Sequence, residues 1–383
     1  MKSPTYQPLR STNPLRYGFS DSVFTHSPSL HTQKQRSKQK QALDHITMAA
    51  PTDTPATTPT PTNEPYVVED CRGLLKVMSD GSIIRSANPL AAFNFPDDSA
   101  VKSKDLLFSS THSLYVRLYR PVKTPPNTKL PIMIFFYGGG FCIGSRTWPN
   151  NHALCRRLSA ELSALVLSFD YRLAPEHRLP AAIEDAEAAL LWLKSQCTGP
   201  NTDPWLAESG DFSMVFISGE SAGGNMTHHM AVKFGSTGLS PVQIRGFILI
   251  MPGLLETELT RSELECPKSA FLNLDACARY LRLALPVGAT REHPAFNPFG
   301  PESPNLENVN MGPILVIAAE SDILIDSNLN YANWLKEMGK KVELVQIAGE
   351  EHAFFSIKPL SEATGEAIQA IGRFMNKTSS GSD

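Results

Sequence analysis

The sequence predicts an α/β domain built on a mostly parallel sheet that helices flank on both faces. Short, continuously apolar runs recur through the chain, as in strands that are buried on both faces. Helical patterns lie between successive runs, and this alternation favours a parallel sheet. Two glycine-rich turns each follow directly after one of these runs. The expected strands are residues 113–119, 131–137, 164–170, 213–218, 244–251, 313–319 and 342–348.

One segment breaks the alternation of strands and helices. Residues 253–300 contain a helical stretch at 269–284 and then a proline-rich loop, and we expect this insertion to form a lid over the site. Elsewhere the helices follow the strands in order. The expected helices are residues 151–162, 180–196, 222–234, 327–339 and 361–375.

The N-terminal part of the chain differs in composition from the rest. Residues 1–47 hold seven basic and two acidic residues, and a basic, serine-rich composition is typical of an organelle transit peptide. A disordered tail, or sequence upstream of a start at Met48, is the simpler alternative. Residues 51–65 contain five prolines and six threonines, which predicts an extended linker. We therefore expect a disordered extension over residues 1–65, a folded domain over residues 66–376 and a disordered tail over residues 377–383.

Composition and charge exclude several classes of protein. The net charge of −3 does not favour a nucleic-acid partner. The apolar runs are far shorter than the roughly 20 residues that span a membrane, so no membrane partner is expected. The six cysteines occur singly, without the paired spacing of a zinc ribbon. The predicted location is the cytoplasm, or a plastid if residues 1–47 are a transit peptide.

The sharpest motif is the sequence Gly-Glu-Ser-Ala-Gly at residues 219–223. It follows a predicted strand and begins a predicted helix, which is the setting of a nucleophile elbow. A tight turn there presents the Ser221 hydroxyl above the strand ends, and the helix N-terminus favours developing negative charge. A serine-rich start of a helix without chemistry is the alternative, and the strand–turn–helix setting argues against it.

A second glycine run, Gly138-Gly139-Gly140, follows the strand at 131–137. Glycines let the backbone approach a substrate and direct N–H groups into the site. In acyl transfer such donors stabilise the oxyanion of the tetrahedral intermediate. We assign this oxyanion hole to the amides of Gly139, Gly140 and Ala222.

A serine nucleophile needs a base and an orienting carboxylate, which follow it along the chain in this kind of fold. His352 is the favoured base because it lies in a loop after a strand. His293 remains an alternative, whereas His228 and His229 lie in the helix that leaves the elbow. The favoured acid, Asp322, lies just beyond another strand. The alternative acids are Glu320 and Asp326, and Asp326 is expected rather to cap the helix at 327–339.

These residues and several further motifs resemble the plant carboxylesterases of the hormone-sensitive lipase-like group of α/β-hydrolases. The resemblance covers about residues 66–376. It rests on several motifs in order, which makes it specific for the fold and for the group. The motifs are GGGF at 138–141 with CIGS after it, DYRLAPEH at 170–177, PAA and ED within 180–185, DPW at 203–205, the elbow with Asn225, SDIL at 321–324 and His352.

The resemblance implies an α/β-hydrolase fold with a helical cap, made by the N-terminal segment at about 66–110 and by an insertion at about 253–290. It implies a catalytic triad of Ser221, Asp322 and His352, and neither a metal nor an organic cofactor. The partner is a small-molecule substrate, and both a monomer and a homodimer remain open.

Two residues depart from the family pattern. Tyr137 stands where the family usually has the histidine of His-Gly-Gly-Gly. It is either a tolerated, loop-organising replacement or a group that contacts substrate as a hydrogen-bond donor or acid/base. Glu220 stands where relatives commonly carry aspartate, a change that looks minor.

The favoured function is a serine carboxylester hydrolase that acts on a small ester through an acyl-enzyme, in plant specialised metabolism. A lyase or cyclase that uses the same pocket for elimination or cyclisation is the first alternative. A binding protein similar to a hormone receptor is the second. Such receptors have lost the catalytic histidine, and His352 therefore argues against it.

Overall fold

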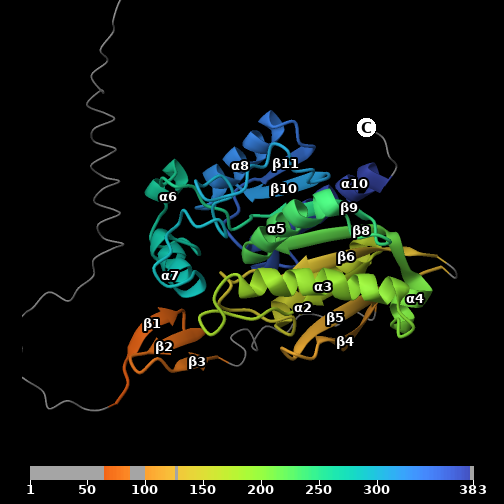
Figure 1. Ribbon diagram of the computed structural model, residues 1–383, viewed down its shortest axis with the longest axis horizontal. Helices are drawn as coiled ribbons and strands as arrows, with labels where there is room; N and C mark the ends of the chain where they lie inside the picture. The colour runs from red at the N-terminus through yellow and green to blue at the C-terminus, as the bar shows by residue number, and fades with distance from the viewer. Residues whose placement is uncertain (1–63, 87–99, 126–127, 380–383) are drawn as a thin grey trace, which may run out of the picture. The chain divides into compact units, whose positions relative to one another are not determined.

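A single eight-stranded sheet organises the molecule. The computed structural model describes residues 64–86, 100–125 and 128–379 (Figure 1). The strands lie in the order β11-β10-β9-β8-β6-β7-β5-β4, parallel from β11 to β7 and antiparallel at β5 and β4. The predicted mostly parallel α/β architecture is confirmed. The strands are β4 (Val101–Ser109), β5 (Leu114–Pro121), β6 (Leu130–Phe136), β7 (Leu165–Phe169), β8 (Gly210–Glu220), β9 (Ile244–Ile250), β10 (Ile314–Ala319) and β11 (Val342–Ile347).

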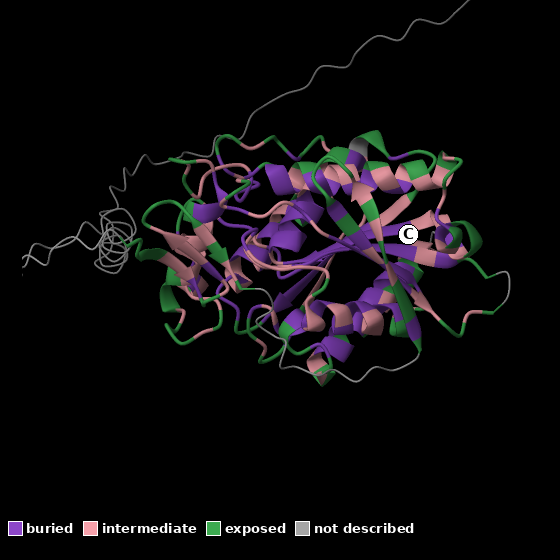
Figure 2. Cartoon of the chain, turned by 90° about the horizontal axis from the view of Figure 1, so that it is seen from below, coloured by how far each residue is buried: buried purple, intermediate pink, exposed green. Residues whose placement is uncertain are grey.

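Helices flank this sheet. α3 and α5 contact each other in front of the sheet as Figure 1 shows it, whereas α2 and α10 contact each other and pack on its other face. Every residue of β7 and β10 is buried, as the continuously apolar runs predict. The interior of the domain is accordingly drawn mostly in the purple of buried residues (Figure 2). The helices are α2 (Pro149–Leu162), α3 (Ala181–Thr198), α4 (Pro204–Ser209), α5 (Ala222–Thr237), α8 (Ile325–Glu337), α9 (Phe354–Ile357) and α10 (Glu362–Ser379).

The N-terminal segment is built from strands, not from the predicted helices. β1 (Val67–Cys71), β2 (Leu75–Met78) and β3 (Ile83–Arg85) form a separate antiparallel sheet. Their β-branched residues favour strands, and glycines with positive φ serve the two turns. β4, in the same predicted segment, joins the main sheet. Residues 87–99 lie outside the described residues.

The insertion at 253–300 carries two helices, α6 (Arg261–Glu265) and α7 (Leu274–Ala284). α7 contacts β1. There the Glu69 carboxylate accepts hydrogen bonds from Arg279 at 3.1 Å and from Arg282 at 2.9 Å. We call β1–β3 together with α6 and α7 the cap.

Two predictions concern the ends of the chain. α10 runs to Ser379, so the predicted disordered tail begins too early; residues 380–383 lie outside the described residues. The predicted extension also lies outside them, apart from residues 64 and 65. None of the helices in the described segments combines the length and apolar character that crossing a bilayer requires.

Candidate active site

Ser221 occupies a sharp turn between the end of β8 and the start of α5. Its backbone has φ 55° and ψ −113°, a strained conformation for a residue with a side chain. Hydrogen bonds hold the turn from both sides. The Ser221 amide donates to the Ile250 carbonyl, and the Ser221 carbonyl accepts from the Gly253 amide, both at 2.9 Å. The strand–turn–helix setting that the motif predicts is therefore present.

The glycines of the motif are required by close packing. A Cβ at Gly223 would lie 1.9 Å from the Phe136 carbonyl oxygen, and one at Gly219 would lie 2.2 Å from the Gly223 oxygen. Neither contact is sterically possible. Only glycine at both positions lets α5 begin directly against β6 and β8.

The structure brings Ser221, His352 and Asp322 together in one hydrogen-bonded chain. Nε2 of His352 lies 2.8 Å from Oγ of Ser221, and Nδ1 lies 2.7 Å from Oδ2 of Asp322. The other oxygen of Asp322 accepts from the Leu324 amide at 2.9 Å. Both His352 and Asp322 are buried. The imidazole is thus fixed between a hydroxyl and a carboxylate, the geometry that activates a serine nucleophile.

The other histidines that follow Ser221 have different partners. His228 pairs with the Tyr331 hydroxyl at 2.8 Å. Nε2 of His229 donates to the Ala295 carbonyl at 3.2 Å, while Nδ1 of His293 accepts from the Ala295 amide. The His229 contact joins α5 to the proline-rich loop, the His228 contact joins α5 to α8, and none of the three contacts involves the serine.

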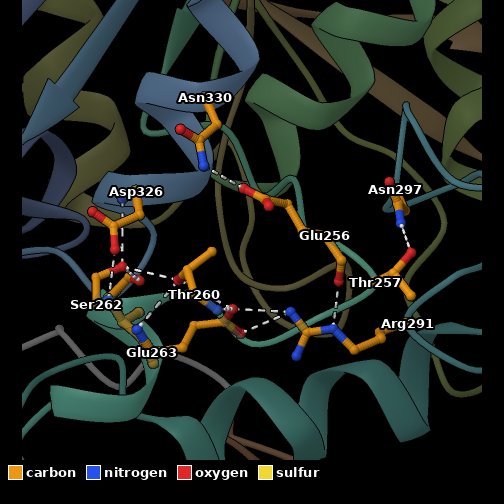
Figure 3. A network of polar contacts seen from close by, with 10 residues as sticks. Glu256, Thr257, Thr260, Ser262, Glu263, Arg291, Asn297, Asp326 and Asn330 are labelled. Atoms are coloured by element: carbon orange, nitrogen blue, oxygen red, sulfur yellow. Dashed lines mark hydrogen bonds and ion pairs between the residues drawn. The ribbon is translucent and has the colours of Figure 1, made fainter. Parts of the chain in front are cut away.

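The alternative acids also lie away from His352. Glu320 is exposed and accepts from the Gly349 amide at 2.8 Å. Asp326 lies in the first turn of α8, but its carboxylate accepts from the Ser262 amide of α6 at 2.7 Å (Figure 3). The prediction that Asp326 caps its own helix is therefore wrong, since it serves the neighbouring helix of the cap.

The pKa values of His352 and Glu220 are both shifted from their ordinary values. Burial alone would lower the pKa of His352, but the charge and hydrogen bond of Asp322, together with Glu220, outweigh it, so the pKa is raised. Burial raises the pKa of Glu220 to about 7. Two carboxyl groups therefore act on one imidazole.

The glycine loop lies against the elbow. Gly139 has φ 129° and Gly140 has φ 59°, and a Cβ at Gly140 would lie 2.5 Å from the Tyr280 ring. Within the described segments, the N–H groups of Gly139, Gly140 and Ala222 donate to no backbone carbonyl. All three residues line the same cavity as Ser221. Their amides are free for a ligand, as an oxyanion hole requires.

Tyr137 lies behind the glycine loop. Its ring stacks on Tyr171 with centroids 4.6 Å apart, and its hydroxyl donates to Asp170 at 3.3 Å. Burial, reinforced by the Asp170 carboxylate, holds the pKa of Tyr137 well above its ordinary value. Tyr137 is buried and is not one of the residues that line the cavity next to Ser221.

The cavity above Ser221 has a volume of about 260 Å³. The cap and the sheet both contribute to its largely apolar wall. Buried amide groups of Asn150 and Asn151 are among the few polar groups there. The cap side of the wall includes Leu74, Phe271, Leu272, Cys277, Tyr280 and Leu281.

A buried polar network attaches the cap insertion (Figure 3). Arg291 donates two hydrogen bonds to Glu263, at 3.0 and 2.9 Å, and the Glu263 side chain is 1% exposed. Glu263 also forms a capping box with Thr260 at the start of α6. Oγ of Ser262 donates to the Ile323 carbonyl at 2.7 Å. The network thus connects α6 to the loop that carries Asp322.

The described residues lack a cluster of the ligand groups that a metal site requires. Within residues 64–86, 100–125 and 128–379, no group of three or more His, Cys, Asp or Glu residues could hold a metal ion. The expectation that the protein needs neither a metal nor an organic cofactor stays a prediction.

Comparison with known proteins assigns the family. Residues 133–356 match the family described as alpha/beta hydrolase fold. The chain belongs to the α/β-hydrolases. It is 37% identical over 305 residues to probable carboxylesterase 6 of Arabidopsis thaliana, covering 78% of this chain and 87% of that protein. The predicted resemblance is confirmed, since several of the relatives it matches are plant carboxylesterases.

Two further similar proteins, one compared by sequence and one by structure, bear on the function of this α/β-hydrolase. It is 33% identical over 319 residues to 2-hydroxyisoflavanone dehydratase of Glycyrrhiza echinata, covering 79% of this chain and 94% of that enzyme. Among solved structures, an esterase of Pyrobaculum calidifontis is 31% identical with a TM-score of 0.60, covering 73% of this chain and 85% of the other. The carboxylesterase interpretation therefore has support from sequence and from structure.

Proposed function

We propose that the protein hydrolyses a small carboxylic ester through an acyl-enzyme on Ser221. The observation that carries this proposal is the continuous chain of hydrogen bonds from Asp322 through His352 to Ser221. This chain ends in the wall of a cavity large enough for a small substrate. The likeness to a plant 2-hydroxyisoflavanone dehydratase supports a role in specialised metabolism.

The proposed reaction has two steps. Oγ of Ser221 attacks the ester carbonyl while Nε2 of His352 takes the hydroxyl proton, and Asp322 stabilises the imidazolium. The tetrahedral intermediate collapses, His352 protonates the alcohol oxygen, and the alcohol leaves. Water then attacks the acyl-enzyme with His352 again as base, which releases the acid and restores the Ser221 hydroxyl.

The oxyanion of each tetrahedral intermediate needs donors, and we assign them to Gly139, Gly140 and Ala222. The first two amides come from the glycine loop, and Ala222 begins α5, where the helix dipole adds to the effect. The positive φ angles of Gly139 and Gly140, which few residues other than glycine adopt, support this assignment.

We assign Tyr137 a loop-organising role rather than a substrate contact. Its stacked, buried ring fills the space behind the glycine loop, and a Cβ at Gly144 would lie 2.6 Å from that ring. With its raised pKa, the Tyr137 hydroxyl is unsuited to acid/base work near neutral pH.

A lyase that eliminates water or cyclises its substrate is the second candidate, and the likeness to a dehydratase favours it. Such an enzyme would use His352 for proton transfer without acylating Ser221. A receptor-like binding protein is less favoured because the complete Ser221–His352–Asp322 chain is present.

The decisive experiment compares wild type with Ser221→Ala on short p-nitrophenyl esters, together with labelling by a fluorophosphonate. We expect the variant to lose about 10⁴- to 10⁶-fold in kcat/KM and all labelling, because the nucleophile is gone. Equal turnover by both proteins would contradict the acyl-enzyme. Folded wild type that is neither labelled nor active would favour the lyase or binding protein.

Location and assembly remain proposals. We propose a cytoplasmic protein, or a plastid protein if residues 1–47 are removed as a transit peptide. Mass mapping of the native N-terminus distinguishes these two locations. We propose a monomer or homodimer that binds a small molecule and neither nucleic acid nor membrane, and sedimentation measures the assembly.

A further inference from the structure

The carboxyl group of Glu220 is a buried acidic group next to the triad that the reaction above leaves unused. Glu220 is the last residue of β8 and directly precedes Ser221, and it is 1% exposed. Its Oε1 accepts a hydrogen bond from the Ser356 amide at 3.2 Å. Ser356 lies in α9, just after the loop that carries His352. Glu220 therefore connects the nucleophile strand to the element that follows the base.

The second oxygen of this carboxyl group lacks a hydrogen-bond partner among the residues that the structure describes. Oε2 of Glu220 is buried and forms no hydrogen bond within the described residues. Burying an unpaired carboxylate oxygen costs free energy. Anchoring α9 requires only one acceptor oxygen, which glutamine would supply equally well. The charge, not the anchor, is what glutamate adds at this position.

The surroundings of Glu220 show where that charge acts. The groups that perturb it are Ser356 of α9, His352 and Asp322, from the loops after β11 and β10. Asp322 opposes its ionisation and His352 favours it. In turn, Glu220 raises the pKa of His352. Glu220 and His352 both line the cavity next to Ser221, so the charges of two carboxyl groups act on one imidazole.

We propose that Glu220 is a positioning residue that acts through His352, as a second carboxylate that stabilises the imidazolium formed when Ser221 attacks. The expected effect on kcat rests on the proposed ester hydrolysis. The expected effect of Glu220 on the pKa of His352 does not, because it applies to the folded protein without any substrate. Asp322 supplies the hydrogen bond and the first charge, and Glu220 adds charge as its own proton leaves near neutral pH.

The test measures His352 directly and compares three variants. NMR of histidine-labelled protein follows the His352 imidazole from pH 5 to 9, with His352→Asn to assign its signal. Glu220→Gln keeps the acceptor for Ser356 and removes the charge, whereas Glu220→Asp keeps the charge. Glu320→Gln is the matched control, because it removes an exposed carboxylate from the neighbouring loop and keeps an acceptor for Gly349.

We expect the imidazole of Glu220→Gln to titrate at lower pH than that of wild type, and the acid limb of kcat/KM to move the same way. Its kcat at pH 8 should fall by about tenfold, the lower end of what a neighbouring charge contributes. Glu220→Asp should titrate close to wild type, and Glu320→Gln should match wild type in both measurements.

The melting temperature provides a second measurement, in which Glu220→Gln should gain stability although it loses activity. Because the folded pKa of Glu220 is raised to about 7, from an ordinary value of 4.5, its contribution favours folding below pH 4.5 and is lost as pH rises through 7. Glu220→Gln should therefore melt at higher temperature than wild type at pH 8, with a smaller difference at pH 5. A merely structural role would lower the melting temperature at every pH.

Unchanged titration of His352 in folded Glu220→Gln would overturn the proposal. If Glu220→Gln does not fold, the titration curve of His352 in the wild type decides alone. Two ionisation steps in that curve would support the proposal, because a neighbouring group then titrates in the same range, and a single step would contradict it. An altered titration in a protein that hydrolyses no ester would leave the role of Glu220 intact and reject the proposed function instead.

Discussion

The two walls of the active site are held in place by different forces. On the sheet side, Ser221 is fixed by backbone hydrogen bonds at 2.9 Å and by glycine packing against the buried ends of β6 and β8. On the cap side, ion pairs add to the apolar packing of residues such as Leu75 and Leu283. Glu69 pairs with Arg279 and Arg282 at the half-buried junction of β1 and α7, and Glu263 pairs with Arg291 under α6.

This difference between the two walls suits two separate tasks, the chemical reaction and the choice of substrate. A triad tolerates little displacement, and a parallel sheet supplies rigid strand ends on which to build it. A cap joined by side-chain pairs can change its sequence without disturbing that geometry. We infer that the sheet determines what reaction occurs, whereas the cap determines which ester enters.

The largest effect after loss of the nucleophile itself should come from the triad acid. Asp322→Asn should lower kcat by about 10⁴-fold, because the amide cannot hold the required tautomer of His352 or stabilise its charge. Steady-state kinetics on a p-nitrophenyl ester measures this. Asp326→Asn removes a carboxylate four residues later that serves the cap, and should retain most of kcat. Equal losses in both variants would contradict the distinction between the two walls.

Loss of the buried ion pair between Glu263 and Arg291 should destabilise the cap. Glu263→Ala leaves Arg291 unpaired in a site where its side chain is 13% exposed, which should cost about 3–5 kcal/mol of unfolding free energy. Urea unfolding measures the loss. Glu265→Ala is the matched control, since its pair with Arg261 on the same helix is exposed and should contribute at most about 0.5 kcal/mol. Similar losses in the two variants would mean that the buried network does not anchor the cap.

The same division explains what could be predicted from the sequence. The strands buried on both faces and the elbow were predictable because local chain chemistry requires them: continuous apolar runs, and glycines where no Cβ fits. The strands of residues 64–86 were missed because the helical cap was expected from the family resemblance, whereas the segment's own β-branched residues favour strands. The role of Asp326 was misjudged because its partner Ser262 lies 64 residues away. Glu220 looked minor for a similar reason, as its burial and its contact with Ser356 appear only in the fold.

The smallest effect should come from Tyr137, which belongs to the sheet side but does not reach the substrate cavity. Tyr137→Phe removes a 3.3 Å hydrogen bond to Asp170 and keeps the ring stacked on Tyr171. Asp170 retains its ion pair with Arg146, so the cost in unfolding free energy should be about 1 kcal/mol. We expect kcat/KM within about twofold of wild type. A loss of a hundredfold or more with an unchanged melting temperature would instead place the Tyr137 hydroxyl in the reaction, and would show that the sheet side also carries a chemical group unlike that of its histidine-bearing relatives.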